Sequence, residues 1–312
     1  MHNALTIDVE DYFQVAAFRR DIRPADWDDY PLRVIDNTWR ILDWLEEYGL
    51  HATFFILGWV ARRAPGLVRE IKGRGHEIAC HGFGHQLLFD IGPERFREDI
   101  RSAKAILEDI CAAPVNGYRA PSYSITRRSL WAPEILVEEG FTYDSSIYPI
   151  HHDLYGMPGE RRFPHLIRCP AGAIREFPIS TWELTGFGRR WRLPIGGGGY
   201  LRLFPAGLIA RAFRHINEQE KQPALLYFHP WEIDPDQPKV RTGWKSRFRH
   251  YHNLEKTFAK LDYLVQRLRF VPLQDVLASF DWRHAETTAT AAQPRSWATA
   301  RPLPTPGRRE TS

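Results

Sequence analysis

The segment His76-Glu-Ile-Ala-Cys-His-Gly-Phe-Gly-His85 carries a short apolar run that leads into two glycines and two histidines. Ile78 and Ala79 are typical of the end of a buried strand, and the glycines after them indicate a loop. His81 and His85 are four residues apart, which places their imidazoles on one side of a helical turn. Two neutral imidazoles suit zinc, iron, nickel or cobalt better than magnesium or calcium. The segment therefore indicates a transition-metal site at a strand end, and a pair of ordinary surface histidines is the alternative.

Length and composition predict one large domain, alone or with a small subdomain. The chain has 312 residues, 43% of them hydrophobic, which is enough to fill the core of a barrel-sized domain. The formal net charge is +4, but residues 283–312 alone carry five Arg against two Glu, so the remainder is nearly neutral. A nearly neutral surface does not follow a phosphate backbone, and we expect no nucleic-acid partner.

The cysteines and the first residues bear on the location of the protein. Cys80, Cys111 and Cys169 lie far apart and form no CxxC pair, which is typical of a reducing compartment. No leading signal sequence is visible, because Asp8 and the acids after it interrupt the first hydrophobic run. No stretch approaches the roughly eighteen apolar residues that a membrane span needs. These features predict a cytoplasmic protein without an integral membrane segment.

Strand and helix patterns alternate along the chain. Apolar runs predict buried strands, and apolar residues at spacings of three and four predict helices between them. The strands are expected at 4–8, 51–57 and 224–229, and the helices at 32–48, 93–111, 206–220, 253–268 and 273–280. At least five such alternations favour an α/β fold, which we interpret as a distorted (β/α) barrel of about seven strands. Residues 148–205, rich in Pro, Gly and Trp, are expected to form loop-rich additions at one end of the barrel.

The expected barrel, including its C-terminal helices, covers residues 1–282. From residue 283 onward Ala, Thr, Pro and Arg dominate without periodicity, which predicts a disordered tail over 283–312. The run from Gly196 to Gly199 lacks the Lys and Ser/Thr of a phosphate-binding loop, so we do not expect phosphate binding there.

Polar residues stand at the C-terminal ends of the predicted strands, where barrels of parallel strands collect their catalytic groups. These residues are Asp8, His81, His85, Arg119, Asp144 and His229. Asp8, Glu10 and Asp11 form a cluster of carboxylates after the first strand, and a bound cation would offset their mutual repulsion. A solvated loop with capping acids is the alternative for this cluster.

In this order, the residues resemble the NodB-homology polysaccharide deacetylases, carbohydrate esterase family four. The family motifs are matched by Thr6-Ile-Asp-Val-Glu-Asp11, His81-Gly-Phe-Gly-His85, Arg119-Ala-Pro-Ser122, Asp144-Ser-Ser-Ile147 and Tyr227-Phe-His229, over roughly residues 3–280. The chain departs from the family pattern in Asp-Val-Glu-Asp, where the family has adjacent aspartates, and in Gly82, where it has Ser or Thr. Asp8-Val-Glu-Asp-Tyr-Phe13 and His229-Pro-Trp-Glu232 look like the subgroup found with exosortase-linked exopolysaccharide loci.

The resemblance implies metal-dependent hydrolysis of N-acetyl groups on a hexosamine-containing polysaccharide or its precursor, in exopolysaccharide biosynthesis. His81, His85 and one carboxylate would hold the metal, with zinc ahead of cobalt, nickel and iron. We expect Glu10 to be that carboxylate, because an extended chain points Asp8 and Glu10 to the same side. Asp11 would then point away and cap the turn near residue 12, whereas a bulge after Asp8 would bring Asp11 to the metal instead.

The resemblance also implies roles for the remaining polar residues. Asp8 would be the general base, oriented and kept ionised by Arg119. His229 as imidazolium would protonate the leaving amine, and Asp144 would fix its tautomer and charge. The backbone N–H near Tyr123 is the expected oxyanion donor. The further expected substrate contacts are Pro121 and Trp231, while Trp182, Trp191 and Trp244 would either stack on sugars or belong to the core.

Two other functions remain compatible with these residues. One is a metal-dependent amidase acting on a small cyclic amide or ureide, since purine-catabolic relatives share the barrel. The other is a non-catalytic glycan-binding subunit, which a complete set of base, acid and ligands disfavours. The expected partner is an N-acetylated glycan or a lipid-linked oligosaccharide, met by a cytoplasmic protein peripheral at the inner face of the membrane. The oligomeric state is left open.

Overall fold

The computed structural model describes residues 1–152, 154–186 and 189–289. Its centre is a largely parallel sheet whose first strand, β1 (Asn3–Val9), is buried along its whole length. The parallel strands around it run in the order β10 (Leu225–Phe228), β1, β2 (Thr53–Ile56), β3 (Glu77–Cys80), β4 (Gly117–Tyr118), β5 (Tyr143–Asp144) and β7 (Gly172–Glu176). These strands confirm the predicted α/β class, and they form the parallel centre of a sheet that has ten strands in the described residues, against the roughly seven predicted.

Shorter strands extend this sheet at its edges. β6 (His165–Cys169) pairs antiparallel with β7, β11 (Phe270–Val271) pairs with β1, and β12 (Thr287–Ala289) pairs with β6. A separate hairpin is formed by β8 (Thr181–Gly186) and β9 (Arg189–Pro194). The two hairpins lie within residues 148–205, the part of the chain expected to add loops and short strands.

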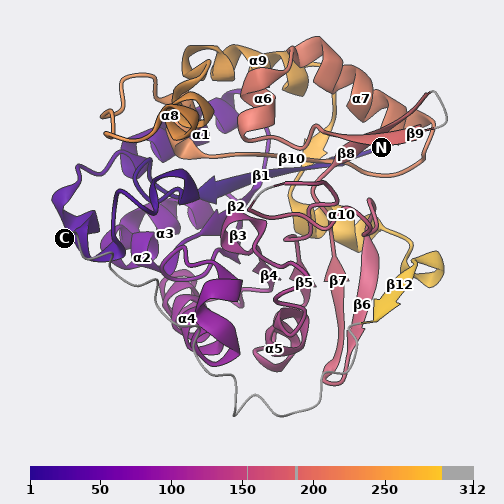
Figure 1. Cartoon of the computed structure of the whole chain (residues 1–312), viewed down its shortest axis with the longest axis horizontal. Helices are drawn as coiled ribbons and strands as arrows, with labels where there is room; N and C mark the ends of the chain where they lie inside the picture. Colours follow the sequence, from indigo (N-terminus) through magenta and orange to yellow (C-terminus); the bar gives the residue numbers. More distant parts are fainter. Residues whose placement is uncertain (153, 187–188, 290–312) are drawn as a thin grey trace, which may run out of the picture.

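Helices cover the outside of the sheet. They are α1 (Val34–Glu47), α2 (Gly58–Arg63), α3 (Pro65–Gly73), α4 (Leu88–Cys111), α5 (Ala132–Glu138), α6 (Gly199–Leu203), α7 (Ala206–Glu218), α8 (Trp244–Tyr251), α9 (Thr257–Val265) and α10 (Leu273–Ser279). Single 3₁₀ turns stand at η1 (Ala16–Phe18), η2 (Pro24–Asp29), η3 (Pro121–Tyr123), η4 (Pro230–Ile233), η5 (Leu254–Lys256) and η6 (Trp282–His284). Figure 1 shows α6, α7 and α9 on one side of β1 and β10, with α2, α3 and α4 on the other. Among the described residues, none of the helices is long and apolar enough to cross a bilayer.

Strand alternation separates the two sides of the sheet. Leu5, Ile7 and Val9 belong to the larger core cluster, which joins the sheet to its helices. Ala4 belongs to a second cluster that collects residues such as Phe55 of β2, Ala79 of β3 and Tyr227 of β10. Because side chains alternate along a strand, Thr6 and Asp8 point to the same inner side as Ala4. The pleat of β1 thus places an acid at the end of the barrel interior.

Irregular backbone completes the ring between β7 and β10. The Ile179 N–H donates to the Ile147 carbonyl, the Ile195 N–H to the Ser180 carbonyl at 3.2 Å, and the Tyr227 N–H to the Gly196 carbonyl at 2.7 Å. At Gly197, where φ is +141°, an added Cβ would lie 1.8 Å from the Tyr227 carbonyl oxygen. Gly197 is therefore needed for close packing against β10.

Regular secondary structure continues past residue 283, the boundary that the sequence predicts. A disordered tail was expected from residue 283, but η6 and β12 continue to Ala289, and β12 adds a strand beside β6. This boundary is a correction, and its cause is the open edge of β6, which a short segment of suitable backbone can pair. The rest of the predicted tail, 290–312, lies outside the described residues.

Candidate active site

The polar residues predicted at strand ends meet at one edge of the sheet. Asp8 and Glu10 come from the end of β1, His81 follows β3, Arg119 follows β4, and His229 follows β10. Because these strands are parallel and adjacent or nearly so, their C-terminal ends lie at the same edge of the sheet. The structure thus brings together the strand-end residues that the sequence analysis selected, with Asp144 lying deeper beside Arg119.

Glu10, His81 and His85 form a compact group of potential metal ligands. One ligand atom from each lies within 4.8 Å of the others, and Glu10 Oε2 is 2.6 Å from His85 Nε2. The side chains of Glu10 and His85 are 3% and 4% exposed. His81 Nδ1 lies 2.8 Å from the Arg119 carbonyl oxygen, which accepts its proton and leaves Nε2 for a metal.

The loop between the two histidines depends on Gly82 and Asp99. Gly82 has φ +73°, and an added Cβ would lie 2.8 Å from Asp99 Oδ2. Asp99, on α4, accepts hydrogen bonds from the N–H groups of Phe83 at 2.7 Å and Gly84 at 3.3 Å. Glycine therefore replaces the usual Ser or Thr because this loop turns through a left-handed conformation against a buried carboxylate.

The chemistry of the three side chains fits a divalent transition metal. Burial lowers the pKa of His81 to about 4, which keeps its imidazole neutral and able to coordinate. Burial alone would raise the pKa of Glu10, but the imidazoles of His85 and His229 outweigh it and hold that pKa well below its usual range. Glu10 Oε2 is buried, and apart from its close contact with His85 Nε2 it has no hydrogen-bond partner in the described part of the chain. Two imidazole nitrogens and one buried carboxylate are the donor set of many catalytic zinc sites.

Asp11 lies outside this group. Its Oδ2 accepts hydrogen bonds from the N–H groups of Arg33 at 2.8 Å and Val34 at 2.9 Å, and its Oδ1 accepts one from Tyr12 at 2.8 Å. Asp11 therefore caps the N-terminus of α1 as well as its own turn. Burial raises its pKa to about 6 in spite of these hydrogen bonds. The structure places Glu10, and not Asp11, with the two histidines.

Arg119 holds Asp8 in a buried ion pair. Its Nη1 donates to Asp8 Oδ1 at 2.6 Å and to the Thr6 hydroxyl at 2.8 Å. Its Nε and Nη2 donate to the carbonyl and hydroxyl oxygens of Ser145, so the guanidinium is fixed from both sides. One Asp8 oxygen is thereby engaged, while Oδ2 faces His229 Nε2 at 3.9 Å. This is the orientation of Asp8 by Arg119 that the resemblance implied.

His229 is held by Glu232, which was not among the predicted site residues. His229 Nδ1 lies 2.8 Å from Glu232 Oε2, and the same oxygen accepts the His229 backbone N–H at 3.0 Å. Burial alone would lower the pKa of His229, but the carboxylates of Glu232 and Glu10 raise it to about 9. Its Nε2 is 3.6 Å from Glu10 Oε1, so the protonated ring edge faces the cavity.

A buried arginine supports Glu232 in turn. Arg202 Nε donates to Glu232 Oε1 at 2.7 Å, and both groups are almost fully buried. Its remaining N–H groups donate to the carbonyl oxygens of Arg249, His250 and His252, at the C-terminal end of α8. His229 is thus anchored through Glu232 and Arg202 to the C-terminal end of α8.

The predicted pairing of Asp144 with His229 is wrong. Asp144 belongs to β5, whose neighbours are β4 and β7, and its cross-strand partner is Glu176. Its Oδ1 accepts a hydrogen bond from the Ser146 hydroxyl, whose oxygen accepts the Ala120 N–H at 2.8 Å. Burial raises the pKa of both carboxyls, that of Asp144 to about 6, and the neighbouring Asp144 raises the pKa of Glu176 further. Asp144 therefore braces the strand end that carries Arg119 and does not contact His229.

The expected substrate contacts are also corrected in part. The Tyr123 backbone N–H donates to the Ala120 carbonyl at 2.9 Å within η3, which contradicts its role as a free oxyanion donor. Trp231 is 6% exposed, and its ring stacks between His229 and His250 at 5.1 and 4.2 Å. Its Nε1 donates to Glu10 Oε1 at 3.2 Å, so Trp231 positions Glu10 and offers no open face to a sugar.

The remaining expected substrate contacts, Pro121 and three tryptophans, do not line the pocket beside His85. Pro121 is buried at the start of η3, near Gly82, where an added Cβ would lie 3.7 Å from its ring. Trp182 is buried against His215. Trp191 on β9 and Trp244 on α8 are exposed, by 48% and 76%.

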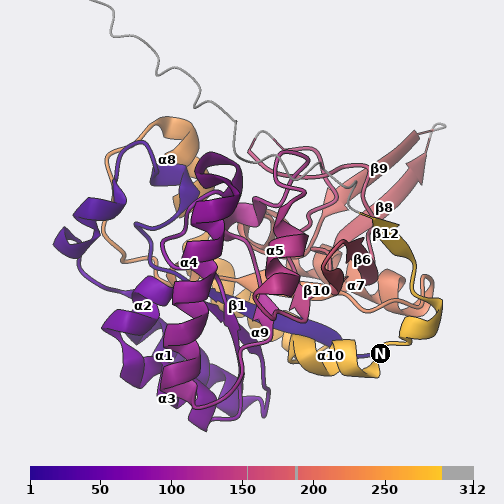
Figure 2. The same cartoon turned by 90° about the horizontal axis from the view of Figure 1, so that it is seen from below.

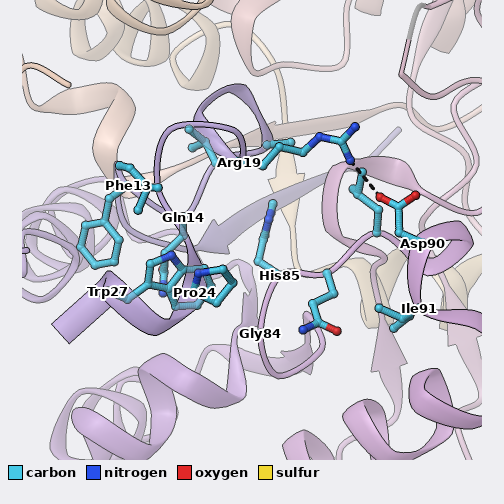
Figure 3. Close-up of a pocket in the computed structure, with 14 residues that line it drawn as sticks. Phe13, Gln14, Arg19, Pro24, Trp27, Gly84, His85, Asp90 and Ile91 are labelled. Atoms are coloured by element: carbon cyan, nitrogen blue, oxygen red, sulfur yellow. Dashed lines mark hydrogen bonds and ion pairs between the residues drawn. The ribbon is translucent and has the colours of Figure 1, made fainter. Parts of the chain in front are cut away.

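A pocket opens beside His85. Figure 3 shows His85 between the side chains of Phe13 and Trp27 on one side and those of Asp90 and Ile91 on the other. The pocket has a volume of about 250 Å³, and the salt bridge between Arg19 and Asp90 spans 2.9 Å at its wall. The rest of its lining is formed by Gln14, Val15, Ala16, Ile22, Pro24, Gly84, Gln86 and Leu87. The pocket therefore reaches the candidate metal group at His85, from the side of η1 and η2.

Two family models match consecutive parts of the chain. Residues 26–136 match the family described as polysaccharide deacetylase. This part of the chain is thus similar to the polysaccharide deacetylases. Residues 145–278 match a domain of unknown function, DUF3473. His81, His85 and Arg119 fall in the deacetylase match, and His229, Glu232 and Arg202 fall in the second. Asp8 and Glu10 precede both matches, so the site combines residues of the two matched segments with the end of β1.

Curated relatives match about a third of this chain, and the match covers only part of their own length. The peptidoglycan-N-acetylglucosamine deacetylase of Bacillus cereus is 32% identical over 101 residues, 32% of this chain and 37% of that protein. The chitooligosaccharide deacetylase of Sinorhizobium fredii is 33% identical over 111 residues, 35% of this chain and 48% of that protein. The chain thus spans less than half the length of these relatives.

Solved structures share the fold over most of the chain. A crystal structure from Mycobacterium smegmatis, provisionally named a polysaccharide deacetylase, superposes with a TM-score of 0.58 at 20% identity, covering 94% of this chain and 93% of its own. PuuE allantoinase superposes with a TM-score of 0.57 at 14% identity, covering 89% of each chain. At these identities the likeness is one of fold.

Proposed function

We propose that this protein hydrolyses N-acetyl groups of a hexosamine-containing glycan in a metal-dependent reaction. The observation that carries the proposal is the arrangement of Glu10, His81 and His85 beside two held side chains, Asp8 and His229. The names of the relatives from Bacillus cereus and Sinorhizobium fredii support an N-acetylated glycan as substrate. The geometry supports amide hydrolysis because Asp8 Oδ2 and His229 Nε2 lie 3.9 Å apart beside the three potential metal ligands.

Glu10, His81 and His85 would hold the metal, with zinc as the preferred ion and cobalt, nickel or iron as alternatives. When bound, such a metal polarises the amide carbonyl and lowers the pKa of a water molecule. Asp8 Oδ2, which is not used by Arg119, accepts a proton from the attacking water. His229, whose pKa is raised to about 9, donates a proton from Nε2 to the leaving amine. Glu232 keeps Nδ1 of that ring occupied throughout, so the proton at Nε2 points into the cavity.

The finer role that we propose is in exopolysaccharide biosynthesis, on a polysaccharide or its lipid-linked precursor. The support is the likeness of Asp8-Val-Glu-Asp-Tyr-Phe13 and His229-Pro-Trp-Glu232 to the exosortase-linked subgroup. Glu10 and Glu232, which set these two segments apart from adjacent aspartates and a bare histidine, are the side chains that complete the metal group and hold His229. We further propose that residues 1–282 act as one catalytic unit, because one sheet contains strands of both matched segments. A cytoplasmic location stays a prediction.

Acetate release from N-acetylglucosamine oligomers tests the proposed function. We expect release that a chelator abolishes and that added zinc restores, and no release by His85→Ala, with His51→Ala on an exposed loop as the matched control. The same assay on a cyclic ureide distinguishes the amidase, which shares the allantoinase fold. Oligomer binding by metal-loaded protein without acetate release would instead identify a glycan-binding subunit and refute the proposal.

A further inference from the structure

The helix α8 and the loop before it form a local basic surface. Residues 237–254 carry five cations and no carboxylate, although the chain before residue 283 is nearly neutral as a whole. All five cations are exposed: Lys239, Arg241, Lys245, Arg247 and Arg249. Asp236 and Glu255 border this segment, and Asp21 accepts a hydrogen bond from Thr242 at 2.7 Å. Positive charge is therefore concentrated on α8 and the loop that precedes it.

Two large aromatic side chains project from the same helix. Trp244 is 76% exposed, the highest value among the exposed large hydrophobic residues, and Phe248 is 54% exposed. They are four residues apart and lie on one face of α8. Neither side chain is needed to attach the helix, because His250 is buried against Trp231 and the carbonyl groups of the last turn bind Arg202. Exposing a tryptophan and a phenylalanine to water has no structural purpose here.

We propose that α8 docks on the surface of an anionic phospholipid bilayer. Lysine and arginine are attracted to acidic headgroups, and tryptophan prefers the bilayer interface. A helix with a basic border and an outward aromatic face lies in the plane of that interface. The helix has eight residues, so it inserts only two aromatic rings and depends on the flanking cations for affinity. A nucleic-acid surface would spread its positive charge over more of the protein, which is nearly neutral elsewhere.

Docking through α8 would bring the catalytic pocket to the membrane. Phe18 of η1 packs on His250 of α8 at 4.6 Å between ring centroids, and η1 also supplies Ala16 to the pocket beside His85. The inner side of α8 reaches the catalytic residues through Arg202 and Trp231. The helix thus connects the bilayer rigidly to the pocket, which suits a substrate presented from a lipid surface. The docking itself does not require the proposed function.

Sedimentation of the full chain with vesicles tests this surface. We expect binding to vesicles of phosphatidylcholine mixed with phosphatidylglycerol, weaker binding at high salt, and none to phosphatidylcholine alone. Lys245→Glu with Arg247→Glu should lower the affinity at least about tenfold, since each cation near an anionic surface contributes about fivefold. Trp244→Ser with Phe248→Ser should also weaken binding, while releasing acetate from soluble oligomers at the rate of the unmodified protein.

Trp191→Ser is the matched control, because Trp191 is an exposed tryptophan on the β8–β9 hairpin at the opposite end of the molecule from α8 (Figures 1 and 2). It should bind vesicles as the unmodified protein does. Thermal unfolding of each variant establishes that it is folded. Equal binding to both vesicle types, equal loss in the Trp191 variant, or displacement from vesicles by duplex DNA at comparable concentration would overturn the proposal. Vesicle binding needs neither metal nor substrate, so failure of the deacetylase proposal leaves this test intact.

Discussion

Replacing Glu10 by Gln is the most informative single change in the metal group. Glu10 supplies the only negative charge among the three ligand side chains, and its Oε2 lies 2.6 Å from His85 Nε2. Glutamine keeps the shape and one carbonyl oxygen but removes the charge. It also leaves the Trp231 N–H an acceptor, so the surrounding packing can persist. The expected consequence is loss of the metal from a folded protein.

The size of the loss follows from the number of ligands. Structural zinc sites with four protein ligands bind with about 10–16 kcal/mol, which is about 3–4 kcal/mol for each ligand. Losing a charged ligand should therefore weaken metal binding by about 10²–10³-fold, at 1.4 kcal/mol for each factor of ten. Asp11→Asn is the matched control, since it also exchanges a buried acid for its amide one residue away. It should lose one or two of three hydrogen bonds, worth about 0.5–1.5 kcal/mol each. The neutral amide avoids the cost of burying a charge, the same cost that raises the pKa of Asp11, and this offsets part of the lost hydrogen-bond energy. The net destabilisation should be about 1 kcal/mol.

The two variants are compared by metal content after dialysis against a buffered metal solution and by urea unfolding. Glu10→Gln should retain little metal, with an unfolding midpoint of its apo form near that of the unmodified apo protein. Asp11→Asn should hold the full complement of metal. Metal loss in Asp11→Asn together with normal retention in Glu10→Gln would refute the assignment of the carboxylate ligand.

Three further changes test the other charged residues. Asp8→Asn should keep its metal and lose about 10²–10⁴-fold in kcat, the usual effect of removing a general base, and an unchanged kcat would place the base elsewhere. Glu232→Gln removes the carboxylate that contributes most to raising the pKa of His229, so the alkaline limb of the pH–rate profile should move to lower pH, and an unmoved limb would mean that His229 is not the acid. Glu176→Gln should flatten the pH dependence of unfolding: the folded pair with Asp144 binds more protons than the unfolded chain, so stability falls as pH rises from about 4 to about 6, and urea unfolding across this window should show a smaller fall in the variant.

The sequence was sufficient to predict the site wherever local geometry decided the outcome. Asp8 and Glu10 share a side because β1 is extended, and His81, Arg119 and His229 meet because parallel strands end at the same edge. These positions need no knowledge of distant packing. Strand order determines the remaining contacts, and order is a property of the whole sheet.

The errors concern residues whose partners come from other elements. Asp144 was paired with His229 because both stand at strand ends, but β5 lies between β4 and β7 and brings Asp144 to Glu176. Glu232 carried a usable signal: it follows His229 by three residues across a proline, the spacing at which an acid reaches back to the first residue of a helical turn. Arg202 had no such signal, because its carboxylate partner is 30 residues away and the rest of its contacts come from α8.

The pairing of β1 with β10 orders events during synthesis of the chain. All three metal-binding side chains lie within the first 85 residues, whereas the proton donor is residue 229 and its strand pairs with residues 4–7. The first strand leaves the ribosome without the neighbour that will cover one of its edges, and about 220 further residues must be made before that neighbour exists. If the proposed function holds, a growing chain can form its metal group early but stays unable to hydrolyse an amide until β10 docks beside β1. Under that proposal, hydrolytic competence reports the docking of β10, and metal retention does not.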